Sequence, residues 1–271
     1  MAPAAPAPAF LVQRSAGQVK LKGRTALITG SSSGIGAAVA CHFAAAGADT
    51  IVINCPGPRQ RAEADAVARR VTESGARGHV IEADVSDAAA VARLVDEANA
   101  FCGPIDIVVN NAGIGHADPV ETMPIETETW DRVLAVHLRG TFLVTRAVLP
   151  LMYARDYGRI INTASQLAYK GAPGVSAYTA AKAGIIGFTR SLAHEIGARN
   201  VRVNCVAPGA TDTPILADVP PDVLEMVRAG IPVGRIATVE QIAPSYVFLA
   251  SPDGDHYQGQ CISPNGGDML L

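Results

Sequence analysis

The sequence has no strong excess of charge and no long apolar run. Its 271 residues include 22 Lys and Arg against 25 Asp and Glu, a formal net charge of −3, and the basic residues form no tract. Nucleic-acid-binding proteins gather basic residues on one face, so we expect no nucleic-acid partner. No apolar run approaches the roughly 20 residues that a membrane helix needs, so we also expect no membrane partner.

Cysteine is scarce and dispersed. The five cysteines form an odd set without a CxxC pair: Cys41, Cys55, Cys102, Cys205 and Cys261. Disulfide frameworks and zinc sites need cysteines paired at short spacings, so this pattern argues against both. We therefore predict no metal site, mostly buried free thiols and a cytoplasmic protein.

The first residues lack the periodicity of a folded segment. Residues 1–18 are rich in Pro and Ala, and we expect a disordered extension there, because the apolar run at residues 10–12 is too short for a secretory signal. No linker or internal repeat divides residues 19–271. With 49% hydrophobic and 17% charged residues, the chain has the composition of one large globular domain.

From Arg24 onward, short β-branched runs alternate with Ala-rich helical stretches. Strands are expected at 26–28, 51–53, 79–81, 105–109, 159–161, 201–206 and 261–262, and helices at 35–47, 59–74, 87–101, 126–154, 176–198 and 239–250. Continuous apolar runs are typical of strands that are covered on both faces. The pattern predicts an α/β single-domain Rossmann fold, a doubly wound seven-stranded parallel sheet with helices on both faces, which binds ligands beyond the carboxyl ends of its strands.

A glycine-rich turn follows the first predicted strand. Gly30, Gly34 and Gly36 frame three serines and lead directly into a predicted helix. Glycines allow a backbone to approach a diphosphate closely, and the free N–H groups at a helix start attract an anion. A turn that only packs strand against helix has the same composition, but the position after the first strand favours a dinucleotide site. A Walker-type loop is excluded because no Gly-Lys-Ser/Thr follows.

Tyr178 and Lys182 are four residues apart at the start of a predicted helix, so they share one face. An ammonium beside a phenol, together with the positive nicotinamide of an oxidised dinucleotide cofactor, favours the phenolate and should lower a pKa that is ordinarily about 10. A phenol tuned in this way can exchange a proton with a carbonyl or an alcohol. Ser165, at the end of the fifth predicted strand, could hold the developing oxyanion. Taken alone, a Tyr–Lys pair more often marks a solvated helix face.

The three glycines, Ser165, Tyr178 and Lys182 together resemble the short-chain dehydrogenase/reductase family, including its β-ketoacyl-carrier-protein reductases, over about residues 20–268. The resemblance implies an NAD(P)-dependent oxidoreductase that interconverts a carbonyl and a secondary alcohol by hydride transfer, with Tyr178 as general acid and base. It also implies cofactor contacts along the whole carboxyl edge: Gly30, Ser32, Ser33, Gly34, Ile35, Gly36, Cys55, Arg59, Asp84, Val85, Asn111, Ala112, Gly113, Tyr178, Lys182, Pro208, Gly209, Thr211 and Thr213.

Two positions depart from the family pattern. His137 stands where many members carry a catalytic Asn. A histidine keeps the backbone carbonyl that holds the family's proton relay and could add its imidazole to it; a helix-lining residue without a catalytic part is the alternative. Pro264 falls in the last predicted strand, and because proline cannot donate to a ladder, we expect it at an edge, an end or a bulge.

The choice of nicotinamide depends on the end of the second strand. No Asp or Glu follows Asn54 until Glu63, whereas Arg59 and Arg61 could pair with a 2′-phosphate. Acidic residues at this place select NAD by repelling that phosphate. Both arginines could equally face solvent, and the glycine turn has Ser33 where many NADP-dependent members have a basic residue. We predict a preference for NADP over NAD.

The substrate is expected to be a small carbonyl compound or alcohol that contacts His116, Gln166, Ile215 and Leu216. The Pro-rich loop 212–235 has the composition of an apolar lid or of a packed helix at 222–229, and it carries no charged cluster that would predict a phosphorylated or dicarboxylate substrate. A cofactor-sensing protein, or a lyase or epimerase that recycles its cofactor, remains an alternative on this fold. The resemblance implies a homotetramer or homodimer formed through the helices at 126–154 and 176–198.

Overall fold

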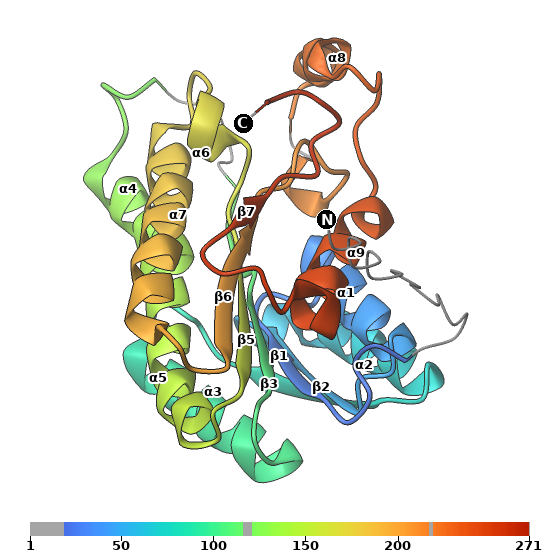
Figure 1. The fold of residues 1–271 in the computed structure, drawn as a ribbon. Coiled ribbons are helices and arrows are strands. Elements are labelled where there is room, and N and C mark those ends of the chain that lie inside the picture. The colour runs from blue at the N-terminus through green and yellow to red at the C-terminus, as the bar shows by residue number, and fades with distance from the viewer. Residues whose placement is uncertain (1–18, 116–120, 217–218, 271) are drawn as a thin grey trace, which may run out of the picture.

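A seven-stranded parallel sheet forms the centre of this computed structural model, which describes residues 19–115, 121–216 and 219–270 (Figure 1). The predicted N-terminal extension lies outside the described residues. The strand order is β3-β2-β1-β4-β5-β6-β7, and all six pairings are parallel. The strands are β1 Thr25–Ile28, β2 Thr50–Cys55, β3 Arg77–Glu82, β4 Ile107–Asn110, β5 Gly158–Thr163, β6 Val201–Val206 and β7 Cys261–Ile262.

Helices cover both faces of the sheet (Figure 1). On one face lie α1 Gly34–Ala45, α2 Arg61–Glu73 and α9 Val239–Ala250; on the other lie α3 Ala88–Cys102, α4 Thr127–Leu134, α5 Gly140–Ala154 and α7 Ser176–Ile196. In β1, Ala26 and Ile28 pack into the first cluster and Leu27 into the second. Because successive side chains of a strand point to opposite faces, a strand covered on both must be apolar throughout. This confirms the predicted fold class.

The direction of the crossovers changes between β1 and β4, which are neighbours in the sheet. The loops that follow these two strands therefore diverge toward opposite faces and leave a crevice at the carboxyl edge. The glycine turn follows β1, and Asn111–Gly113 follow β4, so two of the predicted cofactor segments flank this crevice.

The expected helix over 126–154 is interrupted. A π-helical segment, η2 Ala135–Arg139, separates α4 from α5 and contains His137. One extra residue per turn shifts the side chains that follow, and such segments are frequent at functional sites. The stretch Thr127–Ala154 has the length and apolarity of a membrane span, but Val136, Val144 and Val148 are buried in the core cluster of this face, as in a core helix.

Other differences are local. The fourth strand begins at Ile107 instead of residue 105, and the second helix is preceded by a short turn, η1 Pro58–Gln60. Two helices arise in loops, α6 Leu167–Lys170 and α8 Pro221–Gly230, together with η3 Pro214–Leu216 and η4 Pro252–Gly254. β7 ends at Ile262, so Pro264 lies beyond the strand as expected. All five cysteines are free thiols, and Cys55 and Cys205 are buried.

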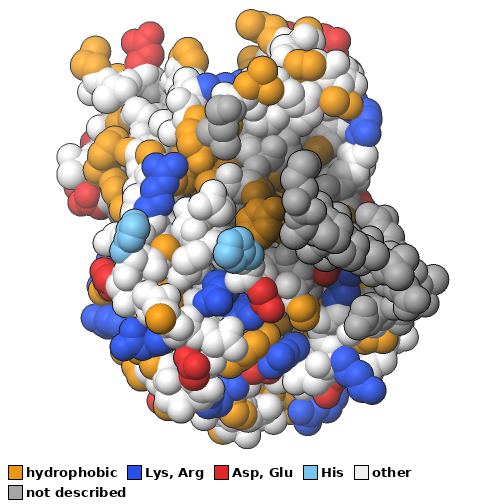
Figure 2. Space-filling view, in the orientation of Figure 1, with side chains coloured by type: hydrophobic (Ala, Val, Ile, Leu, Met, Phe, Trp, Pro, Cys, Tyr) orange, Lys and Arg blue, Asp and Glu red, His pale blue; other side chains and the backbone are white. Residues whose placement is uncertain are grey.

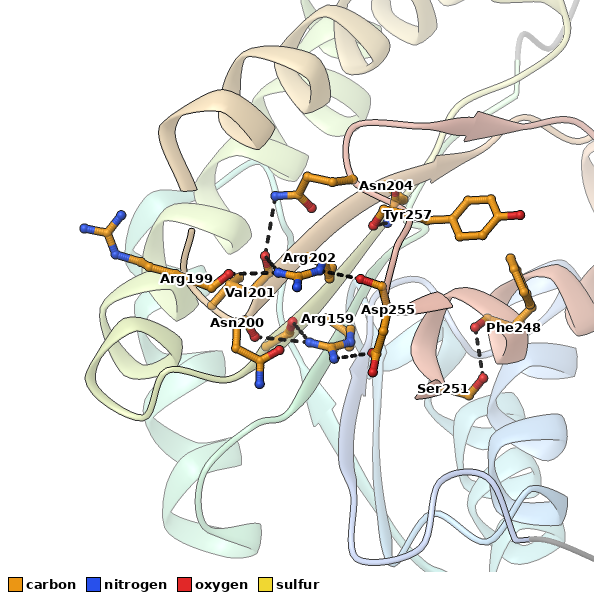
Figure 3. Close-up of polar contacts among 12 residues, drawn as sticks. Arg159, Arg199, Asn200, Val201, Arg202, Asn204, Phe248, Ser251, Asp255 and Tyr257 are labelled. Atoms are coloured by element: carbon orange, nitrogen blue, oxygen red, sulfur yellow. Dashed lines mark hydrogen bonds and ion pairs between the residues drawn. The ribbon is translucent and has the colours of Figure 1, made fainter. Parts of the chain in front are cut away.

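The amino end of the sheet holds a network of arginines (Figure 3). The guanidinium of Arg159, only 3% exposed, donates to Asp255 at 2.6 Å and to the carbonyl oxygens of Gly158 at 2.8 Å and Asn200 at 3.2 Å. Arg202 donates to the Asp255 carbonyl at 2.8 Å. These bonds tie β5 and β6 to the segment that leads into β7.

Candidate active site

A cavity of about 690 Å³ opens at the carboxyl edge of the sheet. Figure 2 shows hydrophobic side chains gathered at this end of the molecule, the end that carries α6 and α8 in Figure 1. Most of the predicted site residues line the cavity: Gly30, Ser33, Gly34, Ile35, Asn111, Gly113, His137, Ser165, Gln166, Tyr178, Lys182, Pro208, Gly209, Thr211, Thr213, Ile215 and Leu216. Ser32, Gly36, Cys55, Arg59, Asp84, Val85 and Ala112 do not, and His116 lies outside the described residues.

The glycine turn presents the start of α1 to the cavity. Gly34 adopts φ +56°, a left-handed conformation that favours glycine. Ser33 is the N-cap of α1, and its side chain makes no capping bond to the first turn. The first N–H groups of the helix are therefore left available for an anion in the cavity. The turn fits the diphosphate of a dinucleotide.

The other two glycines of the turn, Gly30 and Gly36, pack against the segment that follows β4. A Cβ on Gly30 would lie 2.7 Å from the Cα of Ala112, and one on Gly36 would lie 2.5 Å from Asn111 Nδ2. Asn111 Nδ2 donates to the carbonyl oxygens of Thr29 at 3.1 Å and Gly30 at 3.0 Å. These glycines are needed because the segment after β4 packs directly against the turn.

The Ser31 hydroxyl is turned into the protein and does not line the cavity. It is fully buried, donates to the Ile28 carbonyl at 2.7 Å and accepts from the Asn54 N–H at 3.2 Å. Of the three serines in the turn, Ser33 lines the cavity.

Ser165, Tyr178 and Lys182 meet on one wall of the cavity. Ser165 follows β5, and the other two lie in the first turns of α7. Lys182 Nζ lies 5.6 Å from the centre of the Tyr178 ring and donates to the Thr163 carbonyl at 2.6 Å. The lysine side chain is thereby held along the phenol and anchored to the end of β5.

In the protein without a cofactor, burial is the largest influence on the pKa values of Tyr178 and Lys182. It lowers the pKa of Lys182 to about 7. It also raises the pKa of Tyr178, which a hydrogen bond with Ser165 partly offsets. The chain by itself therefore does not lower the phenol pKa, because desolvation of the phenolate outweighs its polar neighbours. The lowered pKa expected with an oxidised nicotinamide bound stays a prediction. A positive group bound in the cavity would lower the pKa of Tyr178.

His137 is 1% exposed and packs its ring edge-on against Tyr178, with 5.2 Å between ring centres. Its Nε2 lies 3.1 Å from the Ile114 nitrogen and 2.9 Å from the Ile114 carbonyl oxygen, and the tautomer of the ring decides which of the two it bonds. The His137 carbonyl accepts from the Thr141 hydroxyl at 2.7 Å. A Cβ on Gly113 would lie 2.5 Å from its Cε1. The glycine after Ala112 thus makes room for the imidazole.

A buried row of polar side chains supports this wall and was not expected from the sequence. Asn110 Nδ2 donates to Asn162 Oδ1 at 2.8 Å, and Asn162 Nδ2 donates to the Thr189 hydroxyl at 2.8 Å. The row links β4, β5 and α7. The available signal was a polar residue near the end of an otherwise apolar strand, as at Asn162.

The segment after β6 forms the opposite wall. Pro208, Gly209, Thr211 and Thr213 all line the cavity, and a Cβ on Gly34 would lie 3.5 Å from Thr213 Cγ2. The segment continues through Ile215 and Leu216 to α8, whose Met226 and Val227 also line the cavity. This outer part of the cavity is apolar.

The remaining predicted cofactor residues lie at the ends of β2 and β3. Asp84 accepts from Ser86 at 2.7 Å and pairs with Arg132 at 3.0 Å, and Val85 is buried beneath Gly140. Arg61 pairs with Asp65 at 2.9 Å and Glu82 at 3.4 Å. Arg59 is exposed, and within the described chain it makes no ion pair.

Two charged residues in the cavity were missed. Lys170 and Asp268 line it beside Gln166, although 98 residues separate them in the sequence. Nothing in the local sequence predicts this pairing, because the C-terminal segment reaches the cavity only through the fold.

Comparisons with known proteins cover nearly the whole described chain. The family model for enoyl-(acyl carrier protein) reductase matches residues 30–268. The 3-oxoacyl-(acyl-carrier-protein) reductase FabG of Aquifex aeolicus is 37% identical over 250 residues, 92% of this chain and 99% of that protein. The cis-4-hydroxycyclohexanecarboxylate dehydrogenase of Sinomonas cyclohexanicum is 39% identical over 245 residues, 90% and 96% of the two chains. The crystal structure of the 3-ketoacyl-(acyl-carrier-protein) reductase of Brucella melitensis complexed with NADH is similar with a TM-score of 0.84 at 33% identity, covering 92% of this chain and 100% of that one.

Proposed function

This chain belongs to the short-chain dehydrogenase/reductase family and is an NAD(P)-dependent oxidoreductase acting on a carbonyl or an alcohol, and we propose that Tyr178 exchanges the proton in its reaction. The observation that carries the proposal is the shared cavity wall of Tyr178, Lys182 and Ser165 opposite the glycine turn. A hydride donor bound along that turn and a carbonyl near the phenol would meet in one enclosed space.

The three side chains have distinct roles in this proposal. The nicotinamide supplies the hydride in reduction and takes it in oxidation. Tyr178 donates its phenolic proton to the carbonyl oxygen or removes the proton of the alcohol. The Ser165 hydroxyl, which also bonds the phenol, holds the substrate oxygen. Lys182 is anchored on the Thr163 carbonyl. In its protonated form, the Lys182 ammonium stabilises the Tyr178 phenolate.

A substrate panel tests the proposed function. Purified protein is assayed with medium-chain ketones, β-ketoacyl thioesters and secondary alcohols, each with both nicotinamides, and the absorbance of the reduced nicotinamide is followed. We expect net oxidation or reduction with at least one class. The two alternative functions, a cofactor sensor and a cofactor-recycling lyase or epimerase, predict no net change with any member; the relatives reported above, a reductase and a dehydrogenase, do not favour these alternatives.

NADP is the cofactor that we propose to be preferred. Support comes from the end of β2, where no carboxylate follows Asn54 before Glu63. The Asn54 amide itself donates to the carbonyl oxygens of Ile81 and Ala83 at 3.2 Å and 3.0 Å. Arg59 is exposed without an ion pair among the described residues, whereas Arg61 is already paired. Arg59 is therefore the better partner for a 2′-phosphate.

The cofactor proposal predicts a selective effect of Arg59→Ala. We expect kcat/KM with NADPH to fall by about tenfold and kcat/KM with NADH to change little, since one charge-assisted contact is worth about 1–2 kcal/mol. Arg69→Ala is the matched control, because Arg69 lies in the adjoining helix α2 and is not among the predicted cofactor contacts. Equal losses with both cofactors, or a wild-type preference for NADH, would contradict the assignment.

For the substrate side we propose that residues 212–235 act as a lid with an apolar inner surface. Ile215, Leu216, Met226 and Val227 line the cavity, and Met226 is 74% exposed. This lining supports an apolar substrate body beside Gln166. His116, which we also propose as a contact, lies outside the described residues.

We propose further that the protein works in the cytoplasm as a homotetramer or homodimer. The five free thiols support a reducing compartment. On α5, Phe142 is 40% exposed and packs against Phe188 of α7, which supports a contact surface there. Val148, on the same helix, belongs to the internal core. Light scattering of the purified protein measures the oligomeric state.

A further inference from the structure

The C-terminal segment places a carboxylate in the cavity. Asp268 accepts hydrogen bonds from Lys170 Nζ at 2.6 Å to each of its two oxygens and from Gln166 Nε2 at 2.5 Å. The Asp268 side chain is 10% exposed and Gln166 is 5% exposed. All three residues line the cavity, and Gln166 directly follows Ser165 in the sequence.

This contact determines how the Gln166 amide is oriented. A carboxylate oxygen only accepts, so the amide atom that faces Asp268 must be the NH₂ group. The amide oxygen Oε1 is therefore turned away from Asp268, and it is buried without a hydrogen-bond partner among the described residues. A buried acceptor left unpaired destabilises the protein, and a hydrogen-bond donor on a ligand that reaches Oε1 would satisfy it.

The C-terminal segment is itself held in place. Asn265 Nδ2 donates to the Met269 carbonyl at 2.7 Å, and Asn265 Oδ1 accepts from the Gly267 N–H at 2.8 Å. The Val233 N–H donates to the Gly266 carbonyl at 3.1 Å. The turn that carries Asp268 is thus fastened to the segment that follows α8, and it bridges the two sides of the cavity.

We propose that Asp268 is a specificity-determining residue, which fixes Gln166 as an acceptor for a hydroxyl or N–H group on the substrate carbon next to the reacting carbonyl. A substrate carboxylate at the same position meets both Oε1 and the Asp268 charge, and Lys170 is already paired, so such substrates are disfavoured. This inference rests on the proposed function, and it narrows the substrate class to neutral carbonyl compounds with an adjacent donor and an apolar remainder.

Three ketones of one chain length test the inference: 2-octanone, 1-hydroxy-2-octanone and 2-oxooctanoate. They place a methyl, a hydroxymethyl or a carboxylate beside the same carbonyl. For the wild type we expect kcat/KM for the hydroxyketone to exceed that for 2-octanone by about tenfold, and that for the 2-oxo acid to be the lowest. In Gln166→Leu, the preference for the hydroxyketone should disappear.

Asp268→Asn gives an opposite and independent readout. It removes the negative charge and releases Lys170, so the ratio of kcat/KM for 2-oxooctanoate to that for 2-octanone should rise by about tenfold. A destabilised protein would lose activity on all three ketones and would not raise this ratio. Asp253→Asn is the matched control, because Asp253 pairs with Lys20 at the surface at 2.5 Å and does not line the cavity.

The outcomes are separable. If the wild type reduces 2-octanone but neither ratio changes in the two variants, the role of Asp268 is overturned and the proposed function stands. If both ratios change as described, the inference is supported. If the folded wild type reduces none of the three ketones with either cofactor, both the inference and the proposed reduction of such ketones are overturned.

Discussion

The two ends of strand β5 lie in opposite kinds of surroundings. At the amino end, Arg159 is almost fully buried, and its donors reach Asp255 and two carbonyl oxygens (Figure 3). The guanidinium of Arg159 also stacks 4.6 Å from the centre of the Tyr157 ring. At the carboxyl end, Ser165, Tyr178 and Lys182 face a cavity. One end pairs its polar groups internally, whereas the other presents them to a ligand.

We infer from this difference that the amino end of β5 contributes mainly to stability and the carboxyl end to the reaction. A buried charge needs compensating partners, and Arg159 has them within the protein. Lys182 has the Thr163 carbonyl as its hydrogen-bond acceptor, and burial lowers its pKa to about 7. Perturbed pKa values of this kind are typical of catalytic sites. Four substitutions test the contrast.

The largest effect is expected for Tyr178→Phe at the carboxyl end. Removing the hydroxyl deletes the proton donor and should lower kcat by about 10³-fold, within the range for general acid–base catalysis. The ring remains and still packs against His137, so the midpoint of thermal unfolding should stay within about 2 °C. Steady-state kinetics and thermal unfolding measure the two quantities. Retained turnover would refute the assigned role.

At the amino end we expect the reverse for Arg159→Met. The substitution removes the contacts to Asp255, Gly158 and Asn200, and it should reduce the free energy of unfolding by about 3 kcal/mol. Below the unfolding transition, kcat should be unchanged, because the site lies at the other end of the strand. Chemical denaturation and kinetics provide the measurements. Arg202→Met, which alters a less buried arginine of the same network, should have a smaller effect on stability.

The pKa of Lys182 predicts a pH-dependent stability in the protein without cofactor. The ordinary pKa is 10.5 and the folded value is about 7, so between these values the unfolded chain binds the additional proton and stability rises with pH. Relative to Lys182→Met, the wild type should gain roughly 2–3 kcal/mol of unfolding free energy between pH 6 and pH 9. Denaturation curves at both pH values test this. A constant difference between the two proteins would show that the lysine is not perturbed.

The smallest effect is expected for His137→Asn. Asparagine keeps the backbone carbonyl that bonds Thr141, and the lost contact with the Tyr178 ring should reduce kcat by less than about tenfold. A loss beyond about a hundredfold would show that the imidazole itself takes part in the reaction. Comparing the pH profiles of kcat for the two proteins distinguishes these cases.

Local patterns determined much of the fold and part of the site. Continuous apolar runs such as residues 51–53 predict strands covered on both faces, and the spacing of Tyr178 and Lys182 predicts a shared helical face. These inferences succeed because they depend on the period of one element. The π-helical segment around His137 was not predicted, since a single inserted residue changes no local pattern.

The sequence by itself determined the alternation of strands and helices, the glycine turn and the identities of Ser165, Tyr178 and Lys182, because each depends on residues that are neighbours along the chain. Only the tertiary structure decided that Asp268 holds Gln166 and Lys170, and that Asn162 links β4, β5 and α7. It also decided the direction of the pKa shift of Tyr178. Contacts between distant segments and the removal of water arise only when the elements pack, and no local pattern records either.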